Sequence, residues 1–145
     1  MLTVGRKKRS AQDLDLYVGS QRAFEWYWDV NGQMSGLDAY ENLNPTARAG
    51  VLAAFEHWGT TPHGERPLQS RVNEEHAKPL ILAAKAGDHR FLAFHAGDDV
   101  WVVTGYYKKQ GSKLDKIGKR EVQRAIAART DYELRVMQGK YYECT

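Results

Sequence analysis

The chain has 145 residues, a formal net charge of +3 and a sequence pI near 9.0. Its length predicts one domain with its own core, and 42% hydrophobic with 27% charged residues excludes a disordered chain. No apolar run is long enough to cross a bilayer, and residues 1–16 lack the apolar segment of a secretory signal, so we expect a cytoplasmic protein without membrane partners.

The first predicted elements are a loose arm and a strand. Residues 1–21 show no periodicity and contain four consecutive basic residues, Arg6 to Arg9, so we expect a flexible or added N-terminal arm. A nuclear-import motif is the alternative to a solvated end for that run. In residues 24–30, Phe, Trp, Trp and Val alternate with Glu, Tyr and Asp, which is typical of a half-buried strand.

Two helices are predicted next. Ser35 followed by an acidic residue three positions later suggests the start of a short helix that runs to about residue 43. Asn44 and Pro45 combine a capping side chain with a proline at the first helical position, and Gly59 suits the end of that helix. Apolar residues at helical spacing support the second helix: Val51, Ala54, Phe55 and Trp58.

After a polar loop expected over residues 60–78, three apolar runs follow one another closely. They read PLILAAK, HRFLAFH and VWVVTGYY, and the turn sequences AGD and AGDD separate them, which predicts an antiparallel meander. A basic amphipathic helix is expected from Lys119. The order of elements predicts an α+β domain over residues 22–133, with a tail at 134–145.

Positive charge is concentrated in one part of the chain. From Lys108 to Arg129 there are eight basic residues against two acidic ones, a surplus of six. This asymmetry favours a polyanionic partner, either nucleic acid or an acidic protein segment. A solvated helix face is the alternative.

The segments HRFLAFH, AGDD and VWVVTGYYKK, followed by the helix KREVQRAIAAR and by Asp131 and Tyr132, resemble the RelE/HigB superfamily of bacterial and phage toxins, particularly its HigB or phage-encoded branch. The likeness covers roughly residues 24–132. It implies a RelE-like small antiparallel sheet with an N-terminal helical hairpin and a C-terminal basic helix.

The resemblance also implies a function. It implies the toxin of a type II toxin–antitoxin pair, an mRNA endoribonuclease that works on the 70S ribosome without metal or other cofactor. Its expected partner is a cognate helix-turn-helix, HigA-like antitoxin, and a complex with an antitoxin dimer is one expected form. The ParE branch of the same fold poisons DNA gyrase, so the fold alone does not decide the activity. A non-enzymatic module that binds nucleic acid or protein is a third hypothesis.

A cluster of basic side chains has the chemistry that metal-free RNA cleavage requires. The 2′-hydroxyl must lose a proton, the phosphorane charge must be neutralised, and the leaving 5′-oxygen must gain a proton. Arginine binds phosphate oxygens through two parallel hydrogen bonds. A lysine crowded by like charges has a lowered pKa and can transfer a proton.

The resemblance gives four catalytic candidates. Arg90 matches the strand arginine of the family and is expected to bind the scissile phosphate, with a surface salt bridge as its alternative. Lys108 and Lys109 match a lysine pair, of which only one is expected to reach the site because neighbours on a strand point to opposite faces. Lys108 is slightly favoured. Lys85 stands where the family often has an arginine. Further RNA-binding candidates are Lys113, Lys119, Arg120, Arg124, Tyr107 and Tyr132.

Three questions stay open at this stage. Tyrosines are more often packed at the edge of a core than stacked on a base, so Tyr107 and Tyr132 have a structural alternative. Arg90 shares its side of a regular strand with Leu92 and Phe94, so either a bulge intervenes or that face is the active one. The catalytic base is not identifiable, and no metal-ligand spacing is present.

Overall fold

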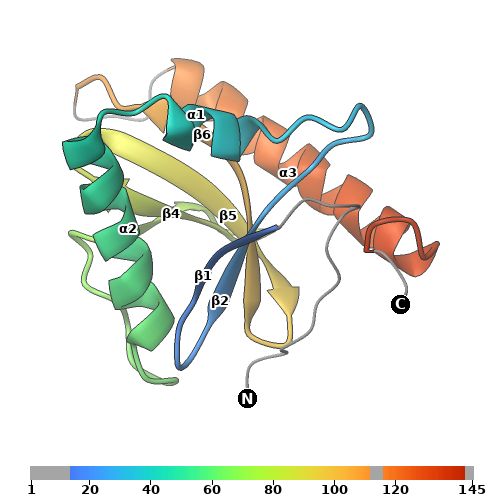
Figure 1. Ribbon diagram of the computed structural model, residues 1–145, viewed down its shortest axis with the longest axis horizontal. Coiled ribbons are helices and arrows are strands. Elements are labelled where there is room, and N and C mark those ends of the chain that lie inside the picture. Colours follow the sequence, from blue (N-terminus) through green and yellow to red (C-terminus); the bar gives the residue numbers. More distant parts are fainter. Residues whose placement is uncertain (1–13, 112–115, 143–145) are drawn as a thin grey trace.

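The computed structural model describes residues 14–111 and 116–142 and shows an α+β fold (Figure 1). Within these residues six strands form one open sheet, accompanied by three helices. The strands are β1 (Asp15–Val18), β2 (Ala23–Trp26), β3 (Val72–His76), β4 (Ile81–Ala86), β5 (His89–Gly97) and β6 (Val100–Lys108). The helices are α1 (Ser35–Glu41), α2 (Pro45–Thr60) and α3 (Lys116–Met137).

The sheet has the strand order β1-β2-β6-β5-β4-β3. All neighbouring strands are antiparallel except β2 and β6, which run parallel. Helices α1 and α2 and three strands connect β2 to β6 along the chain, and parallel neighbours require such a long crossover connection. The predicted meander is confirmed as β4, β5 and β6. Gly87 and Gly97 take positive φ angles of 59° and 92° at its two turns, which is the conformation that makes glycine the favoured residue there.

Helices cover both faces of the sheet, with α1 and α2 on one side and α3 on the other (Figure 1). On the α2 side the ring of Phe24 lies 4.9 Å from Phe55 and 4.8 Å from Trp58. On the α3 side the ring of Phe94 lies 5.2 Å from that of Tyr132. Because β5 and β6 are buried on both faces, their sequences are almost continuously apolar.

The helix starts confirm one expected cap and correct the other. The side chain of Asn44 accepts a hydrogen bond from the N–H of Ala47 at 2.8 Å, and Pro45 is the first residue of α2, as predicted. Helix α1 has Met34 in the capping position, without a side-chain cap, and Ser35 lies inside the helix. The spacing of Ser35 and the acidic residue after it was therefore insufficient to place the N-cap of α1.

Three segments differ from the sequence-based boundaries. Asp15–Val18 lies in the sheet as β1, so the expected loose arm does not extend to residue 21. Val72–His76 forms β3 inside the segment that was expected to be a loop. The strand was not predicted because its sequence, VNEEH, is too polar. Helix α3 continues to Met137, and Tyr141 beyond it is buried, so residues 134–142 pack as part of the domain.

The register of β5 and β6 decides which side chains share a face. Arg90 lies opposite Tyr107 and Leu92 lies opposite Gly105, whereas Ala93 lies opposite Val103, so one extra residue bulges from β6. The bulge lies on the partner strand, so Arg90 stays on the face of Leu92. No bulge separates Arg90 from Leu92, so the first alternative is not observed, and the second, that this face is the active one, stays a prediction. No helix in the described ranges is long and apolar enough to cross a membrane.

Candidate functional site

Three predicted cations meet at one end of the sheet, and we call Lys85, Arg90 and Lys109 the basic corner. Lys85 of β4 lies directly opposite Arg90 of β5. The N–H of Lys109 donates to the carbonyl of Asp88 at 2.7 Å, which ties the end of β6 to the turn between β4 and β5. The three residues therefore come from three neighbouring strands.

Burial and charge act together on Lys85. Its partial burial lowers its pKa first, and the nearby charges of Arg90 and Lys109 lower it further, while Glu75 opposes the shift. The ammonium group donates to the carbonyl of Gln69 at 2.8 Å, which fixes its position. Lys85 is thus a lysine whose proton is held less tightly than usual.

Arg90 is held by the backbone of its own hairpin. The residue is only 7% exposed, and its Nη1 donates to the carbonyls of Gly87 at 2.5 Å and His89 at 3.0 Å. No carboxylate forms an ion pair with it in the part of the chain that the structure describes. The surface salt bridge that was its alternative is therefore not observed.

A carboxylate that sequence reasoning missed borders the basic corner. Glu75 of β3 accepts a hydrogen bond from the hydroxyl of Tyr107 and another from Asn73 at 3.2 Å. Its charge acts on Lys85. The sequence placed Glu75 in a loop, and only the pairing of β3 with β4 brings it here.

Lys108 lies on the opposite face of the sheet from the basic corner. It is exposed and pairs with His89, whose Nδ1 lies 2.6 Å from the hydroxyl of Tyr106. Because side chains alternate along a strand, Lys109 returns to the side of Lys85. Lys109 is therefore the member of the pair that joins the corner, and which of the two lysines contacts phosphate stays a prediction.

The remaining basic candidates lie on α3. Lys119, Arg120 and Arg124 are exposed on its first half, and Lys113 lies outside the described residues. The first turn of α3 carries no acidic residue. Positive charge near a helix N-terminus opposes the helix dipole, so Lys119 and Arg120 contribute positive potential rather than helix stability, whereas Arg124 forms an ion pair with Glu121 one turn earlier.

The two tyrosines expected as stacking platforms belong to the core. Tyr107 and Tyr132 are each 3% exposed. The ring of Tyr132 packs edge-on against Phe94, and its hydroxyl lies 2.8 Å from that of Tyr142. Neither ring is accessible to an extruded base, which corrects the RNA-stacking expectation in favour of the packing alternative.

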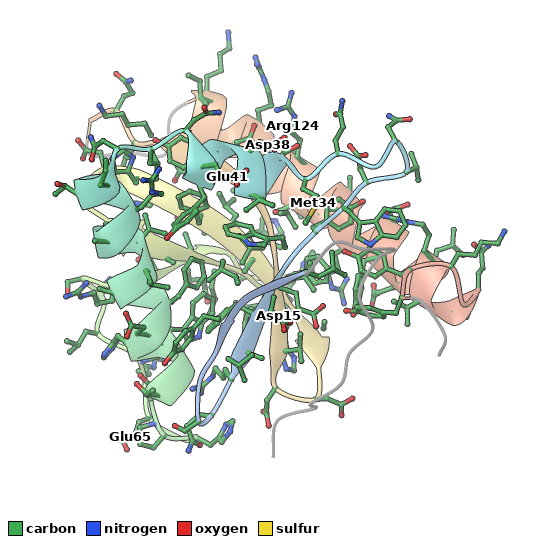
Figure 2. All side chains as sticks on the ribbon, in the orientation of Figure 1. Asp15, Met34, Asp38, Glu41, Glu65 and Arg124 are labelled. Atoms are coloured by element: carbon green, nitrogen blue, oxygen red, sulfur yellow. The ribbon has the colours of Figure 1, made fainter. Side chains whose placement is uncertain are left out.

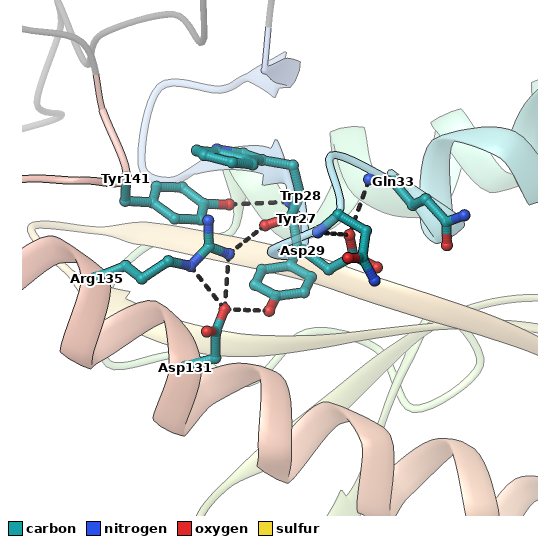
Figure 3. A network of polar contacts seen from close by, with 8 residues as sticks. Tyr27, Trp28, Asp29, Gln33, Asp131, Arg135 and Tyr141 are labelled. Atoms are coloured by element: carbon teal, nitrogen blue, oxygen red, sulfur yellow. Dashed lines mark hydrogen bonds and ion pairs between the residues drawn. The ribbon is translucent and has the colours of Figure 1, made fainter.

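A network of polar contacts fastens the second half of α3 to the loop after β2 (Figure 3). Asp131 accepts hydrogen bonds from Tyr27 and from Nε of Arg135 at 2.9 Å. Nη2 of Arg135 donates to the carbonyl of Trp28 at 2.5 Å, and its guanidinium lies 4.3 Å from the Trp28 ring. On the first half of α3, this loop and the helix leave a polar cleft of about 380 Å³.

A scan against protein-family models finds no match for the chain, and a search of curated proteins finds none. Among the residues with described positions, no three His, Cys, Asp or Glu side chains are placed to hold a metal ion. The corner offers fixed positive charge beside a lysine of lowered pKa, which suits the binding and turnover of a phosphate ester.

Proposed function

We propose that the protein is a ribosome-dependent mRNA endoribonuclease, the toxin of a type II toxin–antitoxin pair with a RelE-like, HigB-type fold. The observation that carries the proposal is the basic corner. Three cations from three strands converge there, and burial together with two neighbouring positive charges lowers the pKa of Lys85. Cationic surfaces that only bind nucleic acid need no such crowding, because exposed lysines already attract phosphate.

In the proposed reaction Arg90 and Lys109 bind the scissile phosphate and neutralise the charge that grows in the transition state. The 2′-oxygen attacks phosphorus and gives up its proton to solvent, and the bond from phosphorus to the 5′-oxygen breaks. Lys85, with its weakly held proton, donates to the departing 5′-oxygen and regains a proton from solvent. The products are a 2′,3′-cyclic phosphate and a 5′-hydroxyl, so atoms and charges balance without a cofactor.

The exposed cations of α3 extend this surface. Lys119 and Arg120 provide charge for flanking phosphates of the message or of ribosomal RNA. An antitoxin with acidic and apolar residues would inhibit the enzyme by covering the corner. A HigA-like helix-turn-helix protein, as a monomer or a dimer, is the partner that the sequence resemblance implies.

Three single variants test the role of the basic corner in a matched way. Expression of the wild type, Lys85→Gln, Lys109→Gln and Lys108→Gln in bacteria is followed by growth and by mapping of 5′ ends on a translated and an untranslatable reporter message. We expect arrest and new ends on the translated message for the wild type and Lys108→Gln. Lys85→Gln should lower cleavage about 100-fold or more, the usual effect of removing a proton donor.

The same experiment separates the alternatives. Arrest without new ends would point to a gyrase poison, and absence of arrest in the wild type would favour a binding module. Equal cleavage by Lys85→Gln and the wild type would remove the corner from the mechanism. Arg90→Ala should abolish cleavage as well, but its melting temperature must be measured because the buried guanidinium also bonds two backbone carbonyls.

A further inference from the structure

The polar cleft lies away from the basic corner, between the loop that follows β2 and the first half of α3. Its volume is about 380 Å³, and its polar walls include Asp29, Gln33, Ser35, Thr104, Glu121 and Arg124. Arg124, labelled on α3 in Figure 2, is 67% exposed and lines the cleft together with Ser35 of α1. The cleft is therefore open to solvent at an arginine that the sequence already marks as a candidate for RNA binding.

Glu121 is the unusual residue of this cleft. Its side chain is only 13% exposed, because it lies over Gly105, where a Cβ atom would stand 2.9 Å from its Oε1. Oε2 accepts from Arg124 at 2.7 Å, and Oε1 has no donor within the described ranges. Oε1 is not sealed from solvent, so it faces the cleft as an acceptor that a ligand can reach.

The pair of Glu121 and Arg124 presents an acceptor and a donor side by side. Arg124 is 67% exposed, so its bond to Glu121 is a surface contact that rearranges at little cost. A second cation is disfavoured beside this guanidinium. The arrangement instead suits a neutral ligand that has an acceptor next to two donors on one edge.

Among the four RNA bases only guanine has that edge. Its O6 accepts, and its N1–H and N2–H groups donate in the same direction, so a carboxylate binds both donors at once. Adenine and cytosine direct a ring nitrogen lone pair at the carboxylate, and uracil offers one donor between two acceptors. Discrimination between bases by such two-point contacts amounts to about 1–3 kcal/mol in nucleic-acid complexes.

We propose that this cleft binds a guanine base of single-stranded RNA, with Glu121 accepting from N1–H and N2–H and Arg124 donating to O6. The inference rests on the proposed function and deepens it by naming the base that the enzyme reads. Arg120 precedes Arg124 by four residues and so lies on the same face of α3, where it meets the neighbouring phosphate. This continuity favours a base within RNA over a free nucleotide.

The loop that forms the other wall is already fixed. Oδ1 of Asp29 accepts the N–H groups of Asn31 and Gln33, each at 2.9 Å. These bonds shape the loop before any ligand arrives. Such pre-organisation lowers the entropy cost of binding, which favours selection of one base by rigid geometry.

The test uses the full chain and fluorescein-labelled five-residue RNAs that differ at the central base, UUGUU, UUAUU and UUIUU, where I is inosine. Fluorescence anisotropy measures the affinity of the wild type, Glu121→Gln and the control Glu133→Gln, an exposed glutamate on the same helix. We expect the wild type to prefer guanine over adenine about tenfold or more, the range that a two-point contact supports. Inosine, which lacks the 2-amino group, should bind less tightly than guanine.

Glu121→Gln should reduce the preference for UUGUU over UUAUU to about twofold or less, whereas Glu133→Gln should retain the preference of the wild type. Arg124→Met changes an exposed side chain and gives a second reading if Glu121→Gln does not fold. Equal binding of UUGUU and UUAUU by the wild type, or an unchanged preference in both cleft variants, would overturn the proposal. GMP that binds as tightly as UUGUU would assign the cleft to a free nucleotide and overturn its RNA part.

The experiments test the nuclease proposal and the guanine-binding proposal separately. A chain that prefers guanine through Glu121 but never cleaves a translated message keeps the cleft and loses the nuclease. A chain that cleaves through Lys85 without a base preference keeps the nuclease and loses the cleft.

Discussion

Asp131 shows how a single carboxylate links α3 to the rest of the protein. Burial alone would raise its pKa, but hydrogen bonds from Arg135 and Tyr27 and the charge of Arg135 outweigh burial. The pKa of Asp131 in the folded protein therefore lies below its ordinary value of 3.8. The ionised form stabilises the fold, because the unfolded chain binds the proton more readily.

Acid should therefore remove this contribution. Stability from Asp131 is fully present above pH 3.8 and declines as the pH falls toward the lower folded-state pKa. In urea unfolding between pH 7 and pH 2.5, Asp131→Asn should lower stability at neutral pH and show a shallower acid loss than the wild type. Glu133→Gln is the control on the same helix. Parallel curves for Asp131→Asn and the wild type would contradict the assignment.

Helix α2 contains two glycines with opposite surroundings, and this contrast belongs to the element as a whole. Gly50 lies in the helix interior, where an added Cβ would be 3.4 Å from the Cβ of Ala86, an ordinary contact. Gly59 lies near the helix end, where an added Cβ would be 2.9 Å from the Tyr17 ring and 3.2 Å from that of Phe24. The helix packs on the sheet closely at one end and loosely at the other.

The two alanine variants should therefore shift the free energy of unfolding in opposite directions. Gly50→Ala should raise it by up to about 1 kcal/mol, because alanine restricts the unfolded chain and favours the helix. Gly59→Ala should lower it by about 1–3 kcal/mol, because buried aromatic rings have little room to move. Urea titrations followed by circular dichroism measure both. A stabilised Gly59→Ala would show that the end of α2 is less tightly packed.

At the scale of the whole molecule, the end of the described chain returns to the loop after β2. Tyr141 is 1% exposed, its ring lies 5.1 Å from that of Trp28 and 4.6 Å from that of Tyr132, and its hydroxyl accepts the N–H of Trp28 at 3.1 Å. This contact joins segments more than 100 residues apart and closes the α3 side of the domain.

Removal of that ring should weaken the entire fold. Tyr141→Ala should cost about 3–5 kcal/mol, the usual loss for a large buried aromatic side chain. Tyr141→Phe keeps the ring and should cost only about 1 kcal/mol for the lost hydrogen bond. Thermal unfolding distinguishes the two. Near-identical melting of Tyr141→Ala and the wild type would mean that the last residues do not support the domain.

Sequence reasoning succeeded where the deciding interactions are local. The Asn44 cap involves neighbours three residues apart, and the glycines at the two meander turns act through their own φ angles. The concentration of basic residues before and within α3 is likewise a property of the sequence alone. These features specify the α+β class, the meander and the basic character of the second half.

Only the tertiary structure decided which side chains meet. Strand β3 owes its existence to pairing with β4, since its polar sequence has no strand pattern, and this pairing brings Glu75 to the basic corner. The register of β5 and β6 selected Lys109 over Lys108 and buried Tyr107. Glu121 became a candidate for binding a ligand because α3 lies over Gly105. Such contacts join residues far apart in the chain, and their geometry depends on how strands pair and helices pack, which local patterns do not encode.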